Sequence, residues 1–350
     1  MGRMVDGTWQ VEEAGTPNAG GRFQRPETRF RDTIAPGTRF APEAGRYHLY
    51  VSLACPWAHR TLIFRHLKGL EEVISLSVTH WHMGAQGWNF APGEGVLPDT
   101  VNGAEVLHQV YAKADPHFSG RVTVPVLWDK ATGSIVNNES AEIIRILNSA
   151  FDGIGAAPGD WYPAPLRAEI DAVNERVYAT LNNGVYRAGF ARTQEAYEEA
   201  VVPLFATLDW LEERLSRQPF LCGEAATEAD WRLFTTLIRF DAVYHGHYQV
   251  QPAADPGLPG AVGLHPVALP APGHRGDGRS RPYQAALLWQ PRLGEPERRG
   301  APRPGAGSGP ARQPPGRAAG LTAPAPRQRA DIARHAAASE PPAATAVGPS

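Results

Sequence analysis

Cys55 is the residue of this 350-residue sequence whose type and position most directly indicate chemistry. Residues 47–52 alternate with the period of a β-strand, and apolar residues recur at helical spacing over 58–70. Pro56 suits the first helical position, where its missing N–H costs nothing, so we expect Cys55 at the N-cap. The free N–H groups and the helix dipole there favour a thiolate. The pattern predicts a nucleophilic or redox cysteine that titrates below a free thiol.

A second interpretation of Cys55 is a small buried residue that only packs. Ala58 stands where a Cys-x-x-Cys pair would have its second cysteine. A disulfide formed on Cys55 would therefore need an external thiol to resolve it, which indicates a monothiol mechanism with a small-molecule partner. Zinc binding by Cys55, His59, His80 and His82 is disfavoured, because their spacing is not that of a structural zinc site. We expect no metal.

The cysteine count and the charge indicate the class of protein. Cys55 and Cys222 are the two cysteines, too few for a disulfide framework, which fits a reducing compartment. No apolar run is long enough to span a bilayer, and the start of the chain lacks a signal-peptide pattern. The sequence predicts a cytoplasmic protein that does not bind membranes.

The elements around Cys55 predict an α/β domain followed by an all-α domain. A strand at 72–79 after the Cys55 helix completes a β-α-β unit. Between it and the next strand lies a long irregular insertion. The remaining elements are strands at 122–129 and 134–136, a short helix at 141–148, and helices at 166–183, 193–216 and 228–244, the last opening with a capping-box-like sequence. We therefore divide the chain into an extended arm (1–45), an α/β domain (46–157), an all-α domain (158–247) and a tail (248–350).

Two further positions permit ligand binding as well as an ordinary structural role. Pro125 lies inside a predicted strand: it is either an edge-strand proline or a cis proline that turns the backbone of Val124 towards a peptide-like ligand. Ser140 begins a predicted helix, where it either caps the helix or joins free N–H groups that bind a carboxylate.

The tail has a different composition from the rest of the chain. Pro, Gly, Ala and Arg make up 67 of the 100 residues from 251 onwards, and lysine is absent there. Such a segment buries too little apolar surface to fold, so we expect disorder. The abrupt change near Tyr248 also suggests translation of a GC-rich gene out of its ancestral frame; a natural low-complexity extension is the alternative.

Seven motifs in order give residues 1–247 a resemblance to the glutathionyl-hydroquinone reductases, the Xi-class, omega-like branch of the glutathione transferases. The motifs are GGRF at 20–23, ACPWA at 54–58, GWNF at 87–90, RVTVPVLWD at 121–129, IVNNES at 135–140, NNGVY at 182–186 and ADWRLF at 229–234. The resemblance implies a thioredoxin-like N-terminal domain, an all-α glutathione-transferase domain that looks truncated, and glutathione as co-substrate. The family is homodimeric and carries further C-terminal helices with another active-site tyrosine, which are not visible after residue 250.

The resemblance also assigns roles to residues. Cys55 would be the nucleophile and Tyr186 would face the hydroquinone. The residues that would hold glutathione are Trp88, Arg121, Val124, Pro125, Glu139 and Ser140. The implied reaction is reduction of a glutathionyl-hydroquinone through a mixed disulfide between Cys55 and glutathione.

Three alternatives remain beside this hypothesis. One is an omega-like thioltransferase or dehydroascorbate reductase, against which the GWNF motif argues. Another is a non-catalytic truncated product. The third is a binding protein whose basic tail contacts nucleic acid; the tail has hardly any aromatic residues for base stacking, so we expect no nucleic-acid partner.

Overall fold

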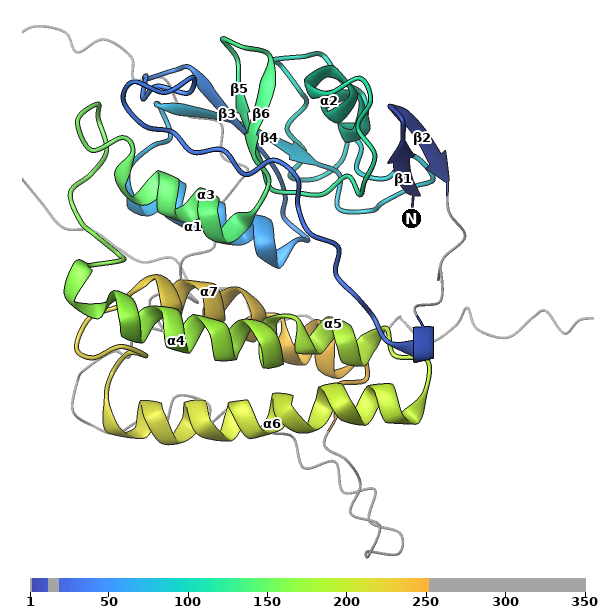
Figure 1. Ribbon diagram of the computed structural model, residues 1–350, viewed down its shortest axis with the longest axis vertical. Coiled ribbons are helices and arrows are strands. Elements are labelled where there is room, and N and C mark those ends of the chain that lie inside the picture. Colours follow the sequence, from blue (N-terminus) through green and yellow to red (C-terminus); the bar gives the residue numbers. More distant parts are fainter. Residues whose placement is uncertain (1, 12–18, 252–350) are drawn as a thin grey trace, which may run out of the picture. The chain divides into compact units, whose positions relative to one another are not determined.

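The structure, a computed structural model, describes residues 2–11 and 19–251, and its main sheet has four strands (Figure 1). The strand order is β4-β3-β5-β6. These strands are β3 (Tyr47–Ser52), β4 (Ile74–Thr79), β5 (Val126–Asp129) and β6 (Ser134–Asn137). Strand β3 pairs parallel with β4 and antiparallel with β5, and β5 pairs antiparallel with β6. Helix α1 (Pro56–Leu67) connects the parallel pair, which confirms the predicted β-α-β unit.

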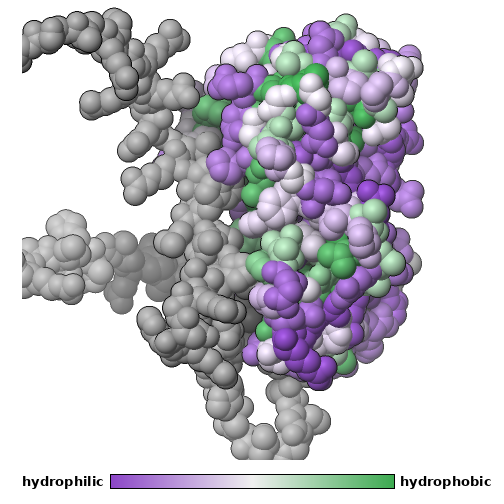
Figure 2. Space-filling view, turned by 90° about the vertical axis from the view of Figure 1, so that its left-hand side faces the viewer, coloured by the Kyte–Doolittle hydropathy of each residue, from purple (hydrophilic) through white to green (hydrophobic). Residues whose placement is uncertain are grey.

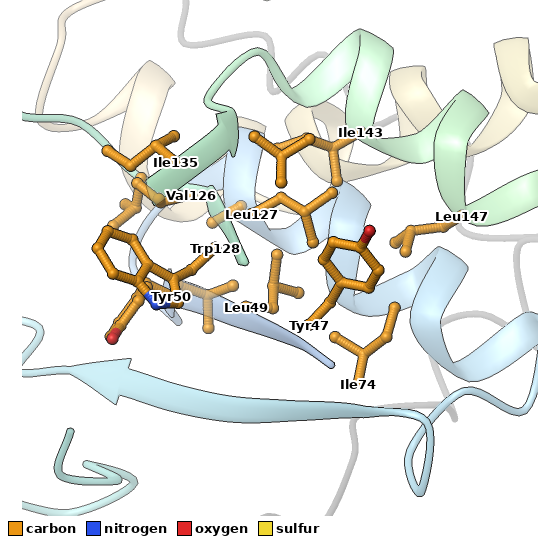
Figure 3. Packing of buried hydrophobic residues seen from close by; sticks show 14 of the residues in the cluster. Tyr47, Leu49, Tyr50, Ile74, Val126, Leu127, Trp128, Ile135, Ile143 and Leu147 are labelled. Atoms are coloured by element: carbon orange, nitrogen blue, oxygen red, sulfur yellow. The ribbon is translucent and has the colours of Figure 1, made fainter. Parts of the chain in front are cut away.

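The core lies between this sheet and the helices packed on it. Helices α1 and α3 (Ser140–Ser149) contact each other and lie on one face of the sheet (Figure 1). Side chains of α3 reach Tyr47 and the strands beside it (Figure 3). All six residues of β3 are buried, polar His48 included, so both faces of this strand are covered. Burying one such large apolar side chain contributes about 1.5–3 kcal/mol, which makes β3 the fixed base from which the Cys55 turn projects.

The second half of the described chain is helical. It begins with a 3₁₀ turn, Ala164–Leu166, and continues through α4 (Arg167–Val177), the π-helical segment η3 (Tyr178–Asn182), α5 (Gly184–Gly189), α6 (Gln194–Arg217), α7 (Glu228–Leu237) and the π-helical segment η4 (Phe240–His245). The predicted capping box at the start of α7 is present between Thr227 and Asp230. The predicted helix at 166–183 changes to a wider turn at η3, where Asn182 hydrogen-bonds to Arg60 of α1 and to Thr236 of α7.

The N-terminal residues and the insertion contain more structure than the sequence indicated. Strands β1 (Gly2–Val5) and β2 (Thr8–Val11) form a hairpin where we expected only an extended arm. The hairpin is held because the Met4 backbone exchanges two hydrogen bonds with Gly120, at 2.9 and 3.0 Å. Helix α2 (Leu107–Ala114) lies inside the insertion that we expected to be irregular, and contacts β6.

Helix α7, the last α-helix of the described residues, packs between the two halves of the fold. Its residues Ala229, Leu233 and Phe234 are buried, because α7 packs against both α1 and α4. Residues 252–350 lie outside the described residues, and so do the predictions of a disordered, frameshifted tail.

The surface in view carries both hydrophilic and hydrophobic residues. In Figure 2 hydrophilic residues surround smaller groups of hydrophobic ones on the face in view. None of the helices within 2–11 and 19–251 is both long and apolar enough to cross a bilayer.

Candidate active site

The strand register brings most of the candidate residues to one end of the sheet. Ser52, at the end of β3, pairs with the end of β4, while Tyr50 pairs with Val126 at the start of β5. The end of β6, Asn137, pairs with Leu127 near the same start. The segments that leave or enter the sheet at this end therefore carry Cys55 after β3, Trp88 after β4, Arg121, Val124 and Pro125 before β5, and Glu139 and Ser140 after β6.

Cys55 occupies the expected N-cap of α1, with Pro56 in the first turn. Its Sγ lies 3.5 Å from the carbonyl oxygen of Val124, to which the thiol donates. The Val124–Pro125 peptide bond is cis, one of the two arrangements considered from the sequence. The nucleophile candidate and the candidate backbone-pairing residue are thus in direct contact.

The electrostatics of Cys55 differ from the sequence expectation. Part of the residue reaches solvent, yet protein atoms surround the thiol closely, and this burial raises its pKa. The backbone N–H groups of Ala58 and Trp57 oppose that effect, as do the charges of Arg25 and Arg239. The expectation of a lowered pKa was wrong because the helix terminus is only one of several contributions and burial exceeds it.

The start of α3 is occupied by its own cap. Glu139 is the N-cap residue, and its carboxylate accepts hydrogen bonds from the Ala141 N–H at 3.2 Å and from the Ser140 hydroxyl at 3.4 Å. Ser140 is the first residue of the helix and is buried. A ligand carboxylate at this terminus has to displace or share the Glu139 contacts.

Trp88 and Arg121 frame the same end of the sheet. The Trp88 side chain is half-buried against the core, and its carbonyl oxygen accepts from the Leu107 N–H at 2.8 Å. The guanidinium of Arg121 donates to the carbonyl oxygen of Gly2 at 3.3 Å. Arg121 thereby joins the N-terminal hairpin to the loop before β5.

Tyr186 lies in a group of aromatic rings beside Cys55. Its ring centroid is 6.1 Å from Trp57, 6.0 Å from Tyr244 and 5.7 Å from Tyr248, and Phe23 of the arm stacks at 6.5 Å. Burial raises the pKa of Tyr186 strongly, and neighbouring Tyr244, with its pKa raised to about 12, is also a neutral phenol near pH 7. The aromatic group around Tyr186 therefore carries protonated hydroxyls near pH 7.

Four neighbours of Cys55 were not identified from the sequence. Arg25 comes from the arm and lies 4.2 Å above the ring of Trp57; Arg239, Tyr244 and Tyr248 come from the end of the helical half. Arg25 follows the GGRF motif closely, and this proximity was the available signal. Arg239, Tyr244 and Tyr248 carried no such signal in the sequence, because only the fold brings them close to the thiol.

Metal binding has no support in the described ranges. Within 2–11 and 19–251, no three His, Cys, Asp or Glu side chains are grouped so as to hold an ion. His59 instead contacts Arg239, and His80 accepts from the His82 N–H at 3.0 Å.

Comparison with known proteins agrees with this geometry. The profile of the glutathione S-transferase N-terminal domain matches residues 54–150, and that of the C-terminal domain matches residues 194–262. Over 249 residues the chain is 61% identical to the glutathionyl-hydroquinone reductase PcpF of Sphingobium chlorophenolicum, covering 71% of this chain and 79% of the relative. The crystal structure of the glutathione S-transferase Xi of Phanerochaete chrysosporium aligns with a TM-score of 0.66 and 51% identity, covering 68% of this chain and 77% of that one. The chain belongs to the Xi-class glutathione transferases.

Another relative was solved with glutathione bound. The glutathione-bound structure of YqjG from Escherichia coli K-12 aligns with a TM-score of 0.65 and 49% identity, covering 72% of this chain and 79% of that chain. Membership of the Xi class places the chain in a family of enzymes, and the Cys-Pro turn and the helical half seen here are elements of a glutathione-transferase fold.

Proposed function

We propose that this Xi-class transferase reduces glutathionyl-hydroquinones to hydroquinones with glutathione as co-substrate. The observation that carries the proposal is the position of Cys55, whose thiol contacts the Val124 carbonyl and lies close enough to the neutral phenols of Tyr186, Tyr244 and Tyr248 to interact with them electrostatically. This arrangement suits a substrate that joins a peptide-like part to an aromatic ring. The similarity to the reductase PcpF supports the same substrate class.

The glutathione part is assigned to the end of the sheet. Val124 would pair with the peptide backbone beside Pro125, and Glu139 and Ser140 at the start of α3 would bind the γ-glutamyl end. Trp88 and Arg121 would close the site from the loops after β4 and before β5. This assignment draws on the common placement of these six residues at one sheet end.

The reaction has two steps. The Cys55 thiolate attacks the glutathione sulfur, so that an S–S bond forms and the bond from sulfur to the ring carbon breaks. The electron pair goes to that carbon, which takes a proton and leaves as the hydroquinone. The thiolate of a second glutathione then attacks the glutathione sulfur of the mixed disulfide, which yields oxidised glutathione and restores the Cys55 thiolate. No second protein cysteine takes part, in agreement with Ala58 at the resolving position.

Tyr186 would act on the aromatic half of the substrate. Its phenol stays protonated because burial raises its pKa, so its O–H is available to hydrogen-bond to the leaving ring. Trp57 and Phe23, which pack against Tyr186, give the ring an apolar surface on which to stack.

The test compares two substrates. The purified chain is assayed with glutathione and either glutathionyl-menadione or dehydroascorbate. We expect turnover of glutathionyl-menadione with release of oxidised glutathione, and a lower kcat/KM for dehydroascorbate. Preference for dehydroascorbate would instead identify an omega-like thioltransferase. If neither substrate is turned over, the chain is a non-catalytic truncated product.

The location and assembly belong to the same proposal. A thiol mechanism that uses reduced glutathione fits the cytoplasm, where thiols stay reduced. A homodimer, as expected for the family, would be seen as twice the monomer mass in light scattering.

A further inference from the structure

Arg239 joins the helical half to both sides of the Cys55 turn. One terminal nitrogen of its guanidinium donates to the carbonyl oxygen of Leu53 at 3.0 Å, just before the turn. The other lies 3.1 Å from Nδ1 of His59, in the first turn of α1, and also donates to the Thr235 carbonyl oxygen at 2.9 Å. A planar fork with fixed donors spans the segment that carries the nucleophile.

The partner His59 is a neutral acceptor in this arrangement. Burial, followed by the charge of Arg239, lowers the pKa of His59 to about 3. The imidazole is therefore uncharged near pH 7, and its Nδ1 accepts from Arg239. Its ring packs against Phe234 at a centroid distance of 5.9 Å, which holds it in place. Arg239 thus holds the His59 ring and the Cys55 turn in place, and neither partner is an anion that would neutralise the guanidinium.

The charge of Arg239 is not neutralised by a carboxylate among the residues 2–11 and 19–251. Its described partners are two carbonyl oxygens and a neutral ring nitrogen. An uncompensated cation in a partly desolvated site acts on nearby anions more strongly than one paired with Asp or Glu. The anion that forms in this site is the Cys55 thiolate.

We propose that Arg239 is a positioning residue for the nucleophile: it clamps the turn that carries Cys55 and supplies a positive charge that faces the thiolate. The inference rests on the proposed function only in taking Cys55 as the nucleophile. In this role Arg239 holds the turn in one orientation, and its charge favours the thiolate form of Cys55.

Other groups face the same thiol and set the background for the test. The N–H groups of Ala58 and Trp57 and the charge of Arg25 act in the same direction as Arg239, while burial acts against them. From the helical half, Tyr186, Tyr244 and Tyr248 interact electrostatically with Cys55 as neutral phenols. Since these groups are unchanged when Arg239 is substituted, the difference between variants reports on Arg239.

The experiment measures iodoacetamide alkylation of Cys55 against pH. All variants carry Cys222→Ala, so that one thiol reacts. In the parent the rate should reach half its maximum above about 8.5, the ordinary value for a thiol. Arg239→Gln should raise that midpoint by about one unit, because a nearby positive charge is lost. Arg239→Lys should keep it, since the charge remains. The control Arg192→Gln removes an exposed cation of the helical half and should leave the midpoint unchanged.

The clamp is tested separately through turnover. At a pH above the midpoint, where the thiol is already ionised, Arg239→Lys should lower kcat/KM for glutathionyl-menadione by about tenfold, because lysine lacks the fork that holds Leu53 and His59. Circular dichroism checks that each variant is folded. If Arg239→Gln does not fold, Arg239→Lys decides: an unchanged midpoint with reduced turnover supports the proposal.

Two results would overturn the inference. An unchanged alkylation midpoint in folded Arg239→Gln would remove the electrostatic role. Parental turnover by Arg239→Lys at every pH would remove the clamp. Alkylation needs neither glutathione nor a hydroquinone, so it tests Arg239 even if the chain reduces no glutathionyl-hydroquinone, and the two failures are distinguishable.

Discussion

The buried carboxylate of Glu228 at the start of α7 accepts a forked pair of hydrogen bonds from Arg145 of α3, at 2.9 and 3.0 Å. Asn174 of α4 and Arg232 of α7 complete its coordination at 2.9 and 3.2 Å. One carboxylate therefore ties the α/β half to two helices of the helical half. The side chain of Glu228 is 1% exposed, so these partners, and not water, stabilise its carboxylate.

Glu228→Gln should destabilise the folded chain. The substitution removes the negative charge that pairs with half-buried Arg145 and buried Arg232. The amide nitrogen of glutamine is also a donor at a position where these arginines need an acceptor. We expect a loss of about 2–3 kcal/mol in the free energy of unfolding by urea denaturation. Glu213→Gln removes an exposed carboxylate paired with Arg217 within α6 and should cost less than about 0.5 kcal/mol. Equal losses would show that the Glu228 network is not special.

His48 should make stability depend on pH. Both of its ring nitrogens contact serine hydroxyls, Ser75 at 2.7 Å and Ser77 at 2.9 Å, and burial lowers its pKa to about 4. As the pH is lowered, His48 of the unfolded chain takes up a proton near pH 6.5, whereas His48 of the folded chain does so only near pH 4. The free energy of unfolding therefore decreases as the pH is lowered from about 6.5 to about 4. The total loss in the free energy of unfolding over this pH range is on the order of 3 kcal/mol.

The measurement is the urea midpoint between pH 7 and 4 for His48→Gln and the parent. The variant should show a shallower decline, since it no longer takes up that proton on unfolding. His247→Gln changes an exposed histidine and should keep the parental slope. A parental slope in His48→Gln would contradict the assignment.

The two cysteines should differ in their effect on turnover. Cys55→Ser should abolish reduction of glutathionyl-menadione, because serine forms no mixed disulfide. Cys222→Ala should keep it, since Cys222 is 2% exposed in the helical core and burial raises its pKa to about 11. Release of oxidised glutathione, followed with a coupled reductase, measures both. Comparable loss in the two variants would mean that Cys55 is not the nucleophile.

Tyr186→Phe should lower kcat more than it changes KM. The aromatic surface next to Trp57 remains, while the O–H that faces the leaving ring is lost, so we expect a 10- to 100-fold decrease in kcat for glutathionyl-menadione. Tyr162→Phe removes a hydroxyl bound to Asp171 at the start of the helical half and should leave kcat unaltered. An intact kcat in Tyr186→Phe would assign the tyrosine to packing.

Short-range signals in the sequence predicted the local structure around the site. Cys55 at the N-cap before Pro56, and the capping box of α7, each depend on a few adjacent residues. The parallel pairing of β3 and β4 followed from their order around a helix. The hairpin at Gly2–Val11 was missed, because its strands are short and are held by Gly120, far along the chain. Helix α2 was missed because its buried residues, Leu107, Val110 and Tyr111, span little more than one turn.

The sequence by itself determined the backbone frame of Cys55 and the family to which the chain belongs, since both are written in adjacent residues and ordered motifs. Only the tertiary structure decided the environment of the thiol. Arg239 and His59 meet although 180 residues separate them, and burial reverses the pKa direction that the helix terminus alone indicates. Electrostatic effects depend on distances in space and on exclusion of water, and neither quantity can be read from spacing along the chain.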